Sequence, residues 1–167
     1  MKKCIVFLLC ATLGISGASE FGKIQEGKRD VCREKFADAI NPFSDSASLS
    51  QAEKLVGFSI EIPDQIKDSS KCIYRFMEQT LLEIIYMDEE ENEIARIRKG
   101  TGEDDISGDY NEYPVCMDIL VGNNLVKLKG EPGKIFVAVW NTDDYSYSVS
   151  TQGISVAEMR KLVGGIR

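Results

Sequence analysis

Residues 115–150 read VCMDILVGNNLVKLKGEPGKIFVAVWNTDDYSYSVS and contain four short strand-like segments. Three of them alternate apolar and polar side chains, and the third in order, Ile135–Trp140, is apolar on both faces. Short turn sequences separate the segments: Gly122-Asn123, then Glu131-Pro132-Gly133, then Asn141 to Asp144. Strands joined by turns this short run antiparallel. We therefore predict a four-stranded antiparallel meander over this stretch.

Further strand signals precede the meander. Phe58–Ile62 alternates and is closed by Pro63, and three more segments follow at Cys72–Met77, Leu81–Met87 and Glu93–Lys99. The segment Leu81–Met87 is apolar on both faces, which is typical of a central strand. The acidic run Asp88 to Glu91 falls at a hairpin tip, where it is interpreted as a solvated turn.

Two helices flank the strands. Ser50-Gln51-Ala52-Glu53 has the pattern of a capping box, and Gly57 is placed to end that helix in a left-handed conformation. A second capping box at Ser155 to Glu158 precedes the apolar residues Met159, Leu162, Val163 and Ile166, spaced for one helix face. The predicted fold class is α+β: a single antiparallel sheet of about seven short strands, with N- and C-terminal helices packed on one face.

The N-terminus predicts export. Lys2 and Lys3 precede an apolar run, Ile5–Ile15, and the small residues Ser16-Gly17-Ala18, which together are typical of a cleaved signal peptide. Lipidation at Cys10 is the competing interpretation, but a small residue should precede that cysteine and Leu9 does not fit. We assign 1–18 to the signal, 19–46 to a polar segment with a possible helix over Asp30–Ile40, and 47–167 to one domain.

Export implies a secreted or cell-envelope location, with no stable membrane span after cleavage, because the apolar run is too short. Losing Lys2 and Lys3 changes the net charge from −7 to −9. A chain this acidic has no basic stripe for phosphates, so nucleic acid is excluded as a partner. The mature chain keeps three cysteines, Cys32, Cys72 and Cys116, whose redox state and pairing stay open.

The chemistry that the sequence permits is narrow. The chain contains no histidine, which removes histidine-dependent nucleophiles and histidine-ligated zinc. No CxxC pair, Walker loop or dinucleotide fingerprint is present, so we predict no metal, no cofactor and no assigned catalytic residue.

The residues after Gly100 concentrate acidic, small and aromatic side chains. The candidate binding residues are Asp104, Asp105, Ser107, Asp109, Tyr110 and Tyr113. Asp105, Ser107, Asp109 and Asn111 have the spacing that begins a calcium loop, but Tyr110 stands where its glycine belongs and Cys116 where its glutamate belongs. The structural interpretation is that Asp and Ser oxygens accept hydrogen bonds from the loop's own amides, with Gly108 at positive φ.

Two functions remain. A non-enzymatic binding module for a protein or glycan would use the aromatic residues Tyr110, Tyr113, Trp140, Tyr145 and Tyr147, although aromatics in strands usually belong to the core. The alternative is a carboxylate-dependent hydrolase of envelope or dietary glycan, with Asp105 and Glu112 as its pair.

Several short motifs, in order, are similar to a family of exported bacterial domains of unknown function. They are Asn41-Pro42-Phe43, Ala52-Glu53-Lys54, Gly57-Phe58 to Pro63, Ile97 to Gly100, Asp104 to Tyr113, Leu128-Lys129-Gly130, Ala138-Val139-Trp140 and Tyr145 to Ser148. The family is of the Firmicutes type, and its domain resembles the extracytoplasmic part of anti-sigma-like membrane proteins. The resemblance spans about residues 41 to 167 and is most specific at Asp105 to Asn111. It implies a secreted α+β domain and supplies no catalytic residues.

Overall fold

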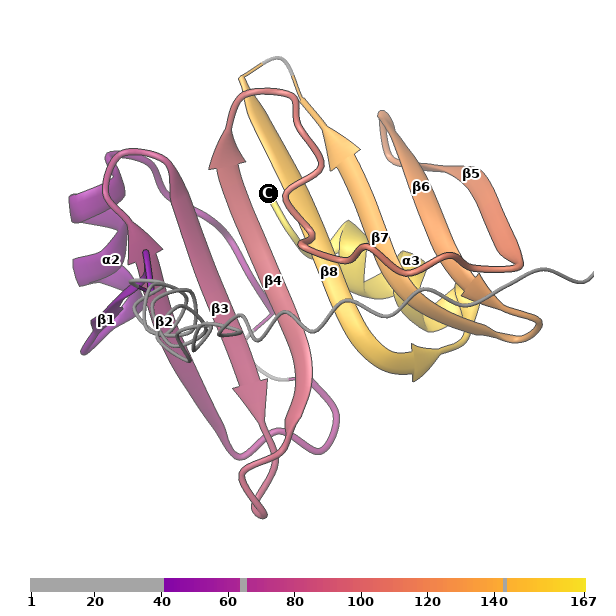
Figure 1. The fold of residues 1–167 in the computed structure, drawn as a ribbon, viewed down its shortest axis with the longest axis horizontal. Helices are drawn as coiled ribbons and strands as arrows, with labels where there is room; N and C mark the ends of the chain where they lie inside the picture. The colour runs from indigo at the N-terminus through magenta and orange to yellow at the C-terminus, as the bar shows by residue number, and fades with distance from the viewer. Residues whose placement is uncertain (1–40, 64–65, 143) are drawn as a thin grey trace, which may run out of the picture. The chain divides into compact units, whose positions relative to one another are not determined.

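The computed structural model describes residues 41–63, 66–142 and 144–167. Residues 41–167 form one unit built on a single antiparallel sheet (Figure 1). The elements are β1 Ser44–Ser46, α2 Leu49–Val56, β2 Lys71–Met77, β3 Leu81–Met87, β4 Glu93–Thr101, β5 Val115–Val121, β6 Asn124–Glu131, β7 Lys134–Asn141, β8 Tyr145–Ile154 and α3 Val156–Gly164. The predicted antiparallel sheet with two helices is confirmed, but it has eight strands instead of about seven. The predictions for the signal, the Asp30–Ile40 helix and Cys32 concern residues outside this range.

The strand order is β1-β2-β3-β4-β8-β7-β6-β5, so the sheet is two meanders joined through β4 and β8. Strands β5 to β8 form the meander predicted from residues 115–150, and β8 returns to pair with β4. To reach β5 at the far edge, the chain leaves β4 and crosses β8, β7 and β6 (Figure 1). We call this segment, residues 102–114, the crossover loop.

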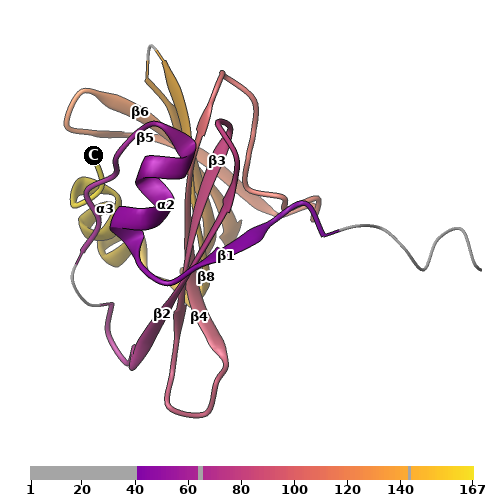
Figure 2. The same ribbon diagram turned by 90° about the vertical axis from the view of Figure 1, so that its left-hand side faces the viewer.

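The hydrophobic core lies between the sheet and the helices. Helix α2 packs on β2 and β3, and α3 packs on β7, β5 and β8. Figure 2 shows both helices on one side of the sheet, which we call the helix face, and the crossover loop on the other side, the loop face. The fully buried side chains of alternate strand positions, such as Leu82 and Ile84 on β3 and Val126 and Leu128 on β6, fill the core.

The cap of helix α2 differs from the prediction. Ser48, not Ser50, is the N-cap, and its hydroxyl accepts a hydrogen bond from the Gln51 amide. Glu53 does not reach back to a cap, because its Oε1 accepts from the Ile60 amide at 2.9 Å and so holds the segment that follows the helix. Gly57 ends the helix with φ +85°, as predicted.

The two serines make a matched test of this cap. Replacing Ser48 with alanine should lower the free energy of unfolding by about 1 kcal/mol, because a first-turn amide of α2 loses its acceptor. Ser50→Ala removes an exposed hydroxyl from the same turn and should change it by less than about 0.5 kcal/mol. Urea denaturation of both variants measures the difference. A larger loss at Ser50 would mean that the sequence pattern, and not the observed cap, describes the helix.

Helix α3 begins as predicted. Its capping box is complete: the Ser155 hydroxyl accepts from the Glu158 amide, and the Glu158 carboxylate accepts from the Ser155 amide. Met159, Val163 and Ile166 are buried against the sheet. The helical spacing therefore identified the buried face of this helix correctly.

The predicted strand Phe58–Ile62 is wrong, although its alternation is real. Ile60 is buried, while Phe58 and Ile62 pack at the edge of the core. The backbone of Glu61 exchanges two hydrogen bonds with Arg167 at the C-terminus, at 2.9 and 3.1 Å, and forms no strand ladder. An extended segment tied to the chain end at one residue shows the same periodicity as a strand. The eighth strand is instead β1, a three-residue edge at Ser44–Ser46 that the sequence did not indicate.

The serine face of β8 is also not where the pattern put it. Alternation of serine with apolar residues is typical of a strand whose polar face meets water, yet Ser146 and Ser148 are each only 1% exposed. The crossover loop runs over this side of β8 (Figure 1), and the Ser146 hydroxyl donates to the Gly102 carbonyl at 2.6 Å. The main chain of the loop therefore shields part of the polar face of β8 from solvent.

Candidate functional site

The crossover loop is held by hydrogen bonds within itself. Asp105 Oδ1 accepts from the Ser107 amide at 2.9 Å, Ser107 Oγ from the Asp109 amide at 3.2 Å, and Asp109 Oδ1 from the Asn111 amide at 2.8 Å. Each bond closes a turn over two residues, so three such turns follow one another. Three of the four residues with calcium-loop spacing thus use a side-chain oxygen to bond the loop's own backbone, as the structural interpretation expected. Within the described residues, no cluster of three His, Cys, Asp or Glu side chains could hold a metal.

A buried carboxylate lies beneath the loop. Glu83, in the middle of the apolar strand β3, is fully buried on the loop face. Arg75 of β2 donates to its Oε1, and Arg98 Nε of β4 donates to its Oε2 at 2.7 Å. Arg98 Nη2 also lies 2.7 Å from Oε2, which completes the ion pair. The antiparallel register places these three residues side by side on neighbouring strands. This strand was predicted to be apolar on both faces, and the cluster was not predicted.

Arg98 connects the buried cluster to the crossover loop. Its Nη1 donates to the carbonyls of Ile106 and Ser107, at 2.9 and 2.8 Å. The ring of Phe43, just before β1, lies against the guanidinium groups of Arg75 and Arg98, at 4.8 and 5.7 Å from its centroid. One carboxylate therefore orients the side chain that fixes the middle of the loop.

Gly108 is constrained twice, and a second glycine in the loop provides its control. Gly108 has φ +67°, and a Cβ there would lie 2.7 Å from Arg98 Nη1, whereas Gly102 has φ +94° with nothing within 4 Å. Gly102→Ala should lower the free energy of unfolding by about 1–2 kcal/mol, from its backbone conformation alone. Gly108→Ala should cost about 1 kcal/mol more, because Arg98 must also give way. Equal losses in urea denaturation would show that Arg98 does not determine the position of the loop.

The candidate residues of the loop do not gather at one point. Asp105 forms an ion pair with Lys129 of β6, with 2.8 Å between Oδ2 and Nζ. Asp109 Oδ2 accepts from the Tyr113 hydroxyl at 2.7 Å, and the Tyr113 ring stacks on Phe136. Asp104 is exposed, and Tyr110 is 96% exposed. The structure therefore brings together Asp105 with Ser107, and Asp109 with Tyr113, and leaves Asp104 and Tyr110 facing outward.

The other predicted aromatic residues belong to the core side of the sheet. Trp140 and Tyr147 stack with 5.1 Å between ring centroids, and both are buried. The ammonium of Lys99 lies 4.4 Å from the ring centroid of Tyr145 and 5.2 Å from that of Tyr147. Of the aromatic set proposed for binding, Tyr110 alone is fully open to solvent.

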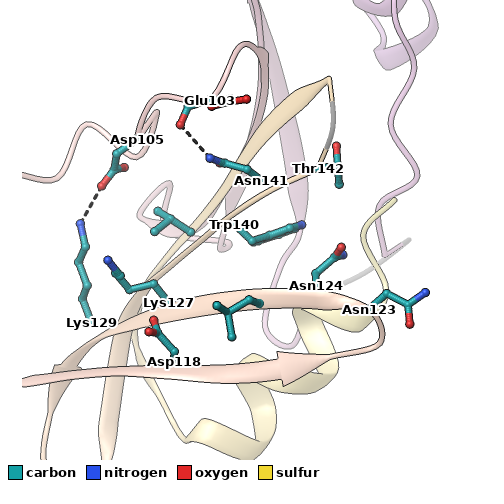
Figure 3. Close-up of a pocket in the computed structure, with 12 residues that line it drawn as sticks. Glu103, Asp105, Asp118, Asn123, Asn124, Lys127, Lys129, Trp140, Asn141 and Thr142 are labelled. Atoms are coloured by element: carbon teal, nitrogen blue, oxygen red, sulfur yellow. Dashed lines mark hydrogen bonds and ion pairs between the residues drawn. The ribbon is translucent and has the colours of Figure 1, made fainter.

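An open cavity lies where two strands separate. β6 and β7 pair from Lys127 with Val139 to Glu131 with Lys134, so Asn124 to Val126 and Trp140 to Asn141 do not pair with each other. The crossover loop closes the third side of the gap (Figure 3). The resulting open cavity, which we call the wedge pocket, has a volume of about 990 Å³. Its lining is Glu103, Asp105, Asp118, Asn123, Asn124, Leu125, Lys127, Lys129, Val139, Trp140, Asn141 and Thr142.

The wedge pocket is polar and carries both signs of charge. Lys127 and Lys129 of β6 face Asp105 and Glu103 of the loop (Figure 3). The side-chain amide of Asn141 donates to the Glu103 carbonyl at 2.8 Å, which ties the loop to β7. Among the described residues, Lys127 forms no ion pair, so its ammonium is available to a ligand. The alternation of Lys127 and Lys129 with buried Val126 and Leu128 was the sequence signal for this face, but the gap itself had none.

A second, smaller cavity lies on the other side of the crossover loop. It has a volume of about 400 Å³ and is lined by Glu93, Arg96, Ser107, Gly108, Asp109, Tyr110, Asn111 and Ser150. Arg96 there is already paired with Glu93, at 3.0 Å from its Nε, and lies 3.4 Å from Glu83. Three predicted binding residues thus border this cavity, and Asp105 borders the wedge pocket.

Two carboxylates of the loop, Asp105 and Asp109, are poor proton donors. Burial alone would raise the pKa of Asp105, but hydrogen bonds from Lys129 and Ser107 outweigh it and hold the pKa below its usual value. The pKa of Asp109 is also lowered, because hydrogen bonds from Tyr113 and Asn111 outweigh its burial. A glycosidase acid needs a raised pKa, so neither side chain is tuned for that role.

Cys72 on β2 and Cys116 on β5 are free thiols, and burial raises the pKa of Cys72. Their strands lie near opposite edges of the sheet, too far apart in the strand order to be bridged.

Across residues 41–63, 66–142 and 144–167, no helix is long and apolar enough to cross a membrane.

Comparison of the chain with protein-family models, curated protein sequences and solved structures found no match. The fold and the geometry of the site therefore carry the functional argument.

Proposed function

We propose that this protein is an exported, non-enzymatic binding module that acts at the cell surface or outside the cell, and that the wedge pocket is its binding site. The observation that carries the proposal is an open polar cavity between the crossover loop and the separated ends of β6 and β7. With the N- and C-terminal helices on one face, the loop face is left for a ligand.

The chemistry of the lining favours a glycan. The amides of Asn123, Asn124 and Asn141 both donate and accept, as sugar hydroxyls do. Carboxylates and ammonium groups stand together in the pocket, so no single charge selects a strongly charged ligand. Trp140 is buried between the strands and leaves hydrogen bonding as the main means of recognition.

The carboxylate-dependent hydrolase has less support. Asp105 is engaged by Lys129, and its lowered pKa keeps it ionised at neutral pH. Its proposed partner, Glu112, is exposed and is not part of either cavity lining. A binding role uses the same residues without requiring a proton donor.

Titration with soluble fragments of peptidoglycan and of plant polysaccharides, followed by NMR, tests the site. Backbone and side-chain shifts should concentrate at Asn124, Lys127 and Asn141, and Lys127→Ala should weaken binding by about tenfold, the value of one charge-assisted hydrogen bond. Asn111→Ala, at the smaller cavity, is the matched control and should leave affinity unchanged. Shifts confined to the smaller cavity, or none with any glycan, would contradict the proposal.

The predicted cleavage of the signal peptide can be tested separately. Mass spectrometry of the protein secreted by an expressing host should show a mature chain that begins at Ser19, because cleavage is expected after Ala18. A secreted or cell-associated protein that still begins at Met1 would contradict the signal assignment.

A further inference from the structure

The free edge of β5 is long, and few of the usual protective features are present. Strand β5 spans seven residues, and no described strand pairs with its outer side (Figure 1). Natural sheets protect such edges with proline, lysine, bulges or short length. Val115–Val121 contains no proline or lysine, and its pairing with β6 runs without a register shift. The opposite edge, β1, has three residues only.

Apolar side chains concentrate beside this edge. Met117 and Leu120 of β5 are 40% and 61% exposed, and Leu125 of β6 is 64% exposed. They are three of the five large apolar residues that are exposed in the described part of the chain. Between Val115 and Glu131, Asp118 and Glu131 balance Lys127 and Lys129, so this hairpin does not share the chain's net negative charge. Two copies of an acidic protein can approach each other here without strong repulsion.

The hairpin geometry shows which backbone groups of β5 point away from β6. Val121 pairs with Asn124 across the two-residue turn Gly122-Asn123, and Gly122 has φ +59°. Residues that flank a two-residue turn exchange both backbone hydrogen bonds, and the bonded positions then alternate along the strand. Leu120, Asp118 and Cys116 therefore direct their N–H and C=O groups away from β6, toward the open edge. The Leu120 carbonyl already accepts a hydrogen bond from Arg160 Nη1 at 2.6 Å, and in an antiparallel pair Pro114 of a second copy would have no N–H to offer it.

We propose that β5 pairs with β5 of a second copy of this chain, antiparallel and about a two-fold axis at Met117. In this register the two Met117 side chains meet, Val115 lies opposite Ile119 of the second copy, and Leu120 lies opposite its Pro114. Asp118 lies opposite Cys116 of the second copy. An axis at Asp118 would instead place two carboxylates opposite each other, which destabilises an antiparallel pair. The result is one continuous sheet through both copies, and the proposal does not depend on the proposed glycan site.

A proline substitution can disrupt pairing at the free edge of β5 without disrupting its pairing with β6. The Asp118 amide points outward, so Asp118→Pro removes a donor to the second copy without removing one to β6. Asp118→Ala keeps the amide and serves as the control. Sedimentation equilibrium of the purified exported chain should show a reversible dimer for the wild type and for Asp118→Ala. Asp118→Pro should raise the dimer dissociation constant by about tenfold or more, since both copies lose a hydrogen bond.

Cross-linking tests the register independently, including the case in which the proline variant does not fold. In a Cys116→Ser background, Met117→Cys should form an intermolecular disulfide under mild oxidation, because the axis brings both copies of residue 117 together. Leu120→Cys in the same background should not. A wild-type chain that remains monomeric at about 100 μM, where pairs of micromolar affinity are already formed, would overturn the proposal. A dimer that cross-links through Leu120→Cys and not through Met117→Cys would overturn it equally.

Discussion

Replacing Glu83 with glutamine should lower the free energy of unfolding by about 3–5 kcal/mol, the range expected when one partner of a buried ion pair is removed. Glu83 is fully buried and accepts hydrogen bonds from Arg75 and Arg98. Glutamine fills the same volume but loses the charge, and its amide group faces guanidinium donors that need an acceptor. Urea denaturation followed by circular dichroism gives the loss directly.

The size of this effect comes from the arginines that remain. Arg75, Arg96 and Arg98 all approach the carboxylate, and without it their positive charges lie together under the crossover loop. Arg98 also holds the carbonyls of Ile106 and Ser107, so its displacement should loosen the loop as well. Relative to the wild type, Glu83→Gln should increase the hydrogen-exchange rate more at residues 106–109 than at the core of β7, which would show this second consequence.

An exposed pair on the same sheet provides the control. Glu91 contacts Lys71 at 2.5 Å, but their side chains are 74% and 45% exposed. Glu91→Gln should therefore lower the free energy of unfolding far less than Glu83→Gln does, because water screens the exposed pair. If Glu83→Gln costs no more than Glu91→Gln, the buried cluster contributes nothing particular to this fold.

Sequence analysis missed Glu83 for a physical reason. Periodicity records which face a residue occupies, and one polar residue in an apolar strand hardly changes that signal. Its partners, Arg75 and Arg98, stand 8 and 15 residues away along the chain and meet it only through the registers of β2, β3 and β4. A charged residue inside a strand that is otherwise apolar on both faces was nevertheless a usable indication of a buried ion pair.

Local chemistry was more readily predicted than pairing. The turns within the crossover loop, the positive φ of Gly108 and the Ser155 cap each depend on residues within a few positions of one another. Glu53, which the pattern placed in a capping box with Ser50, instead accepts from the Ile60 amide seven residues further along the chain. The wedge pocket depends on where β6 and β7 cease to pair, and the polar cover over β8 depends on the path of the crossover loop. These tertiary features have no local pattern.

Gly130→Ala should cost about 3 kcal/mol, although its chemical change is a single methyl group. Gly130 lies in β6 where the register with β7 shifts between Lys129 and Gly130. A Cβ at this position would lie 2.2 Å from the Lys134 carbonyl oxygen and 2.9 Å from the Ile135 Cα. Both are backbone atoms of the neighbouring strand, so no side chain can rotate away, and β6 and β7 must move apart.

Gly133 in the same hairpin separates this crowding from backbone conformation. Gly133 has φ +83°, and nothing lies within 4 Å of its would-be Cβ. Gly133→Ala should therefore cost only the penalty for the left-handed conformation, about 1–2 kcal/mol. Gly130 does not have a positive φ, so its larger loss can come only from the approach of the two strands. Because Gly130 also pairs with Val115, where the crossover loop joins β5, the variant should accelerate hydrogen exchange along the β5–β6 hairpin. A Gly130→Ala chain as stable as Gly133→Ala would mean that β6 and β7 move apart at low cost at this register shift, and that Gly130 does not set their spacing.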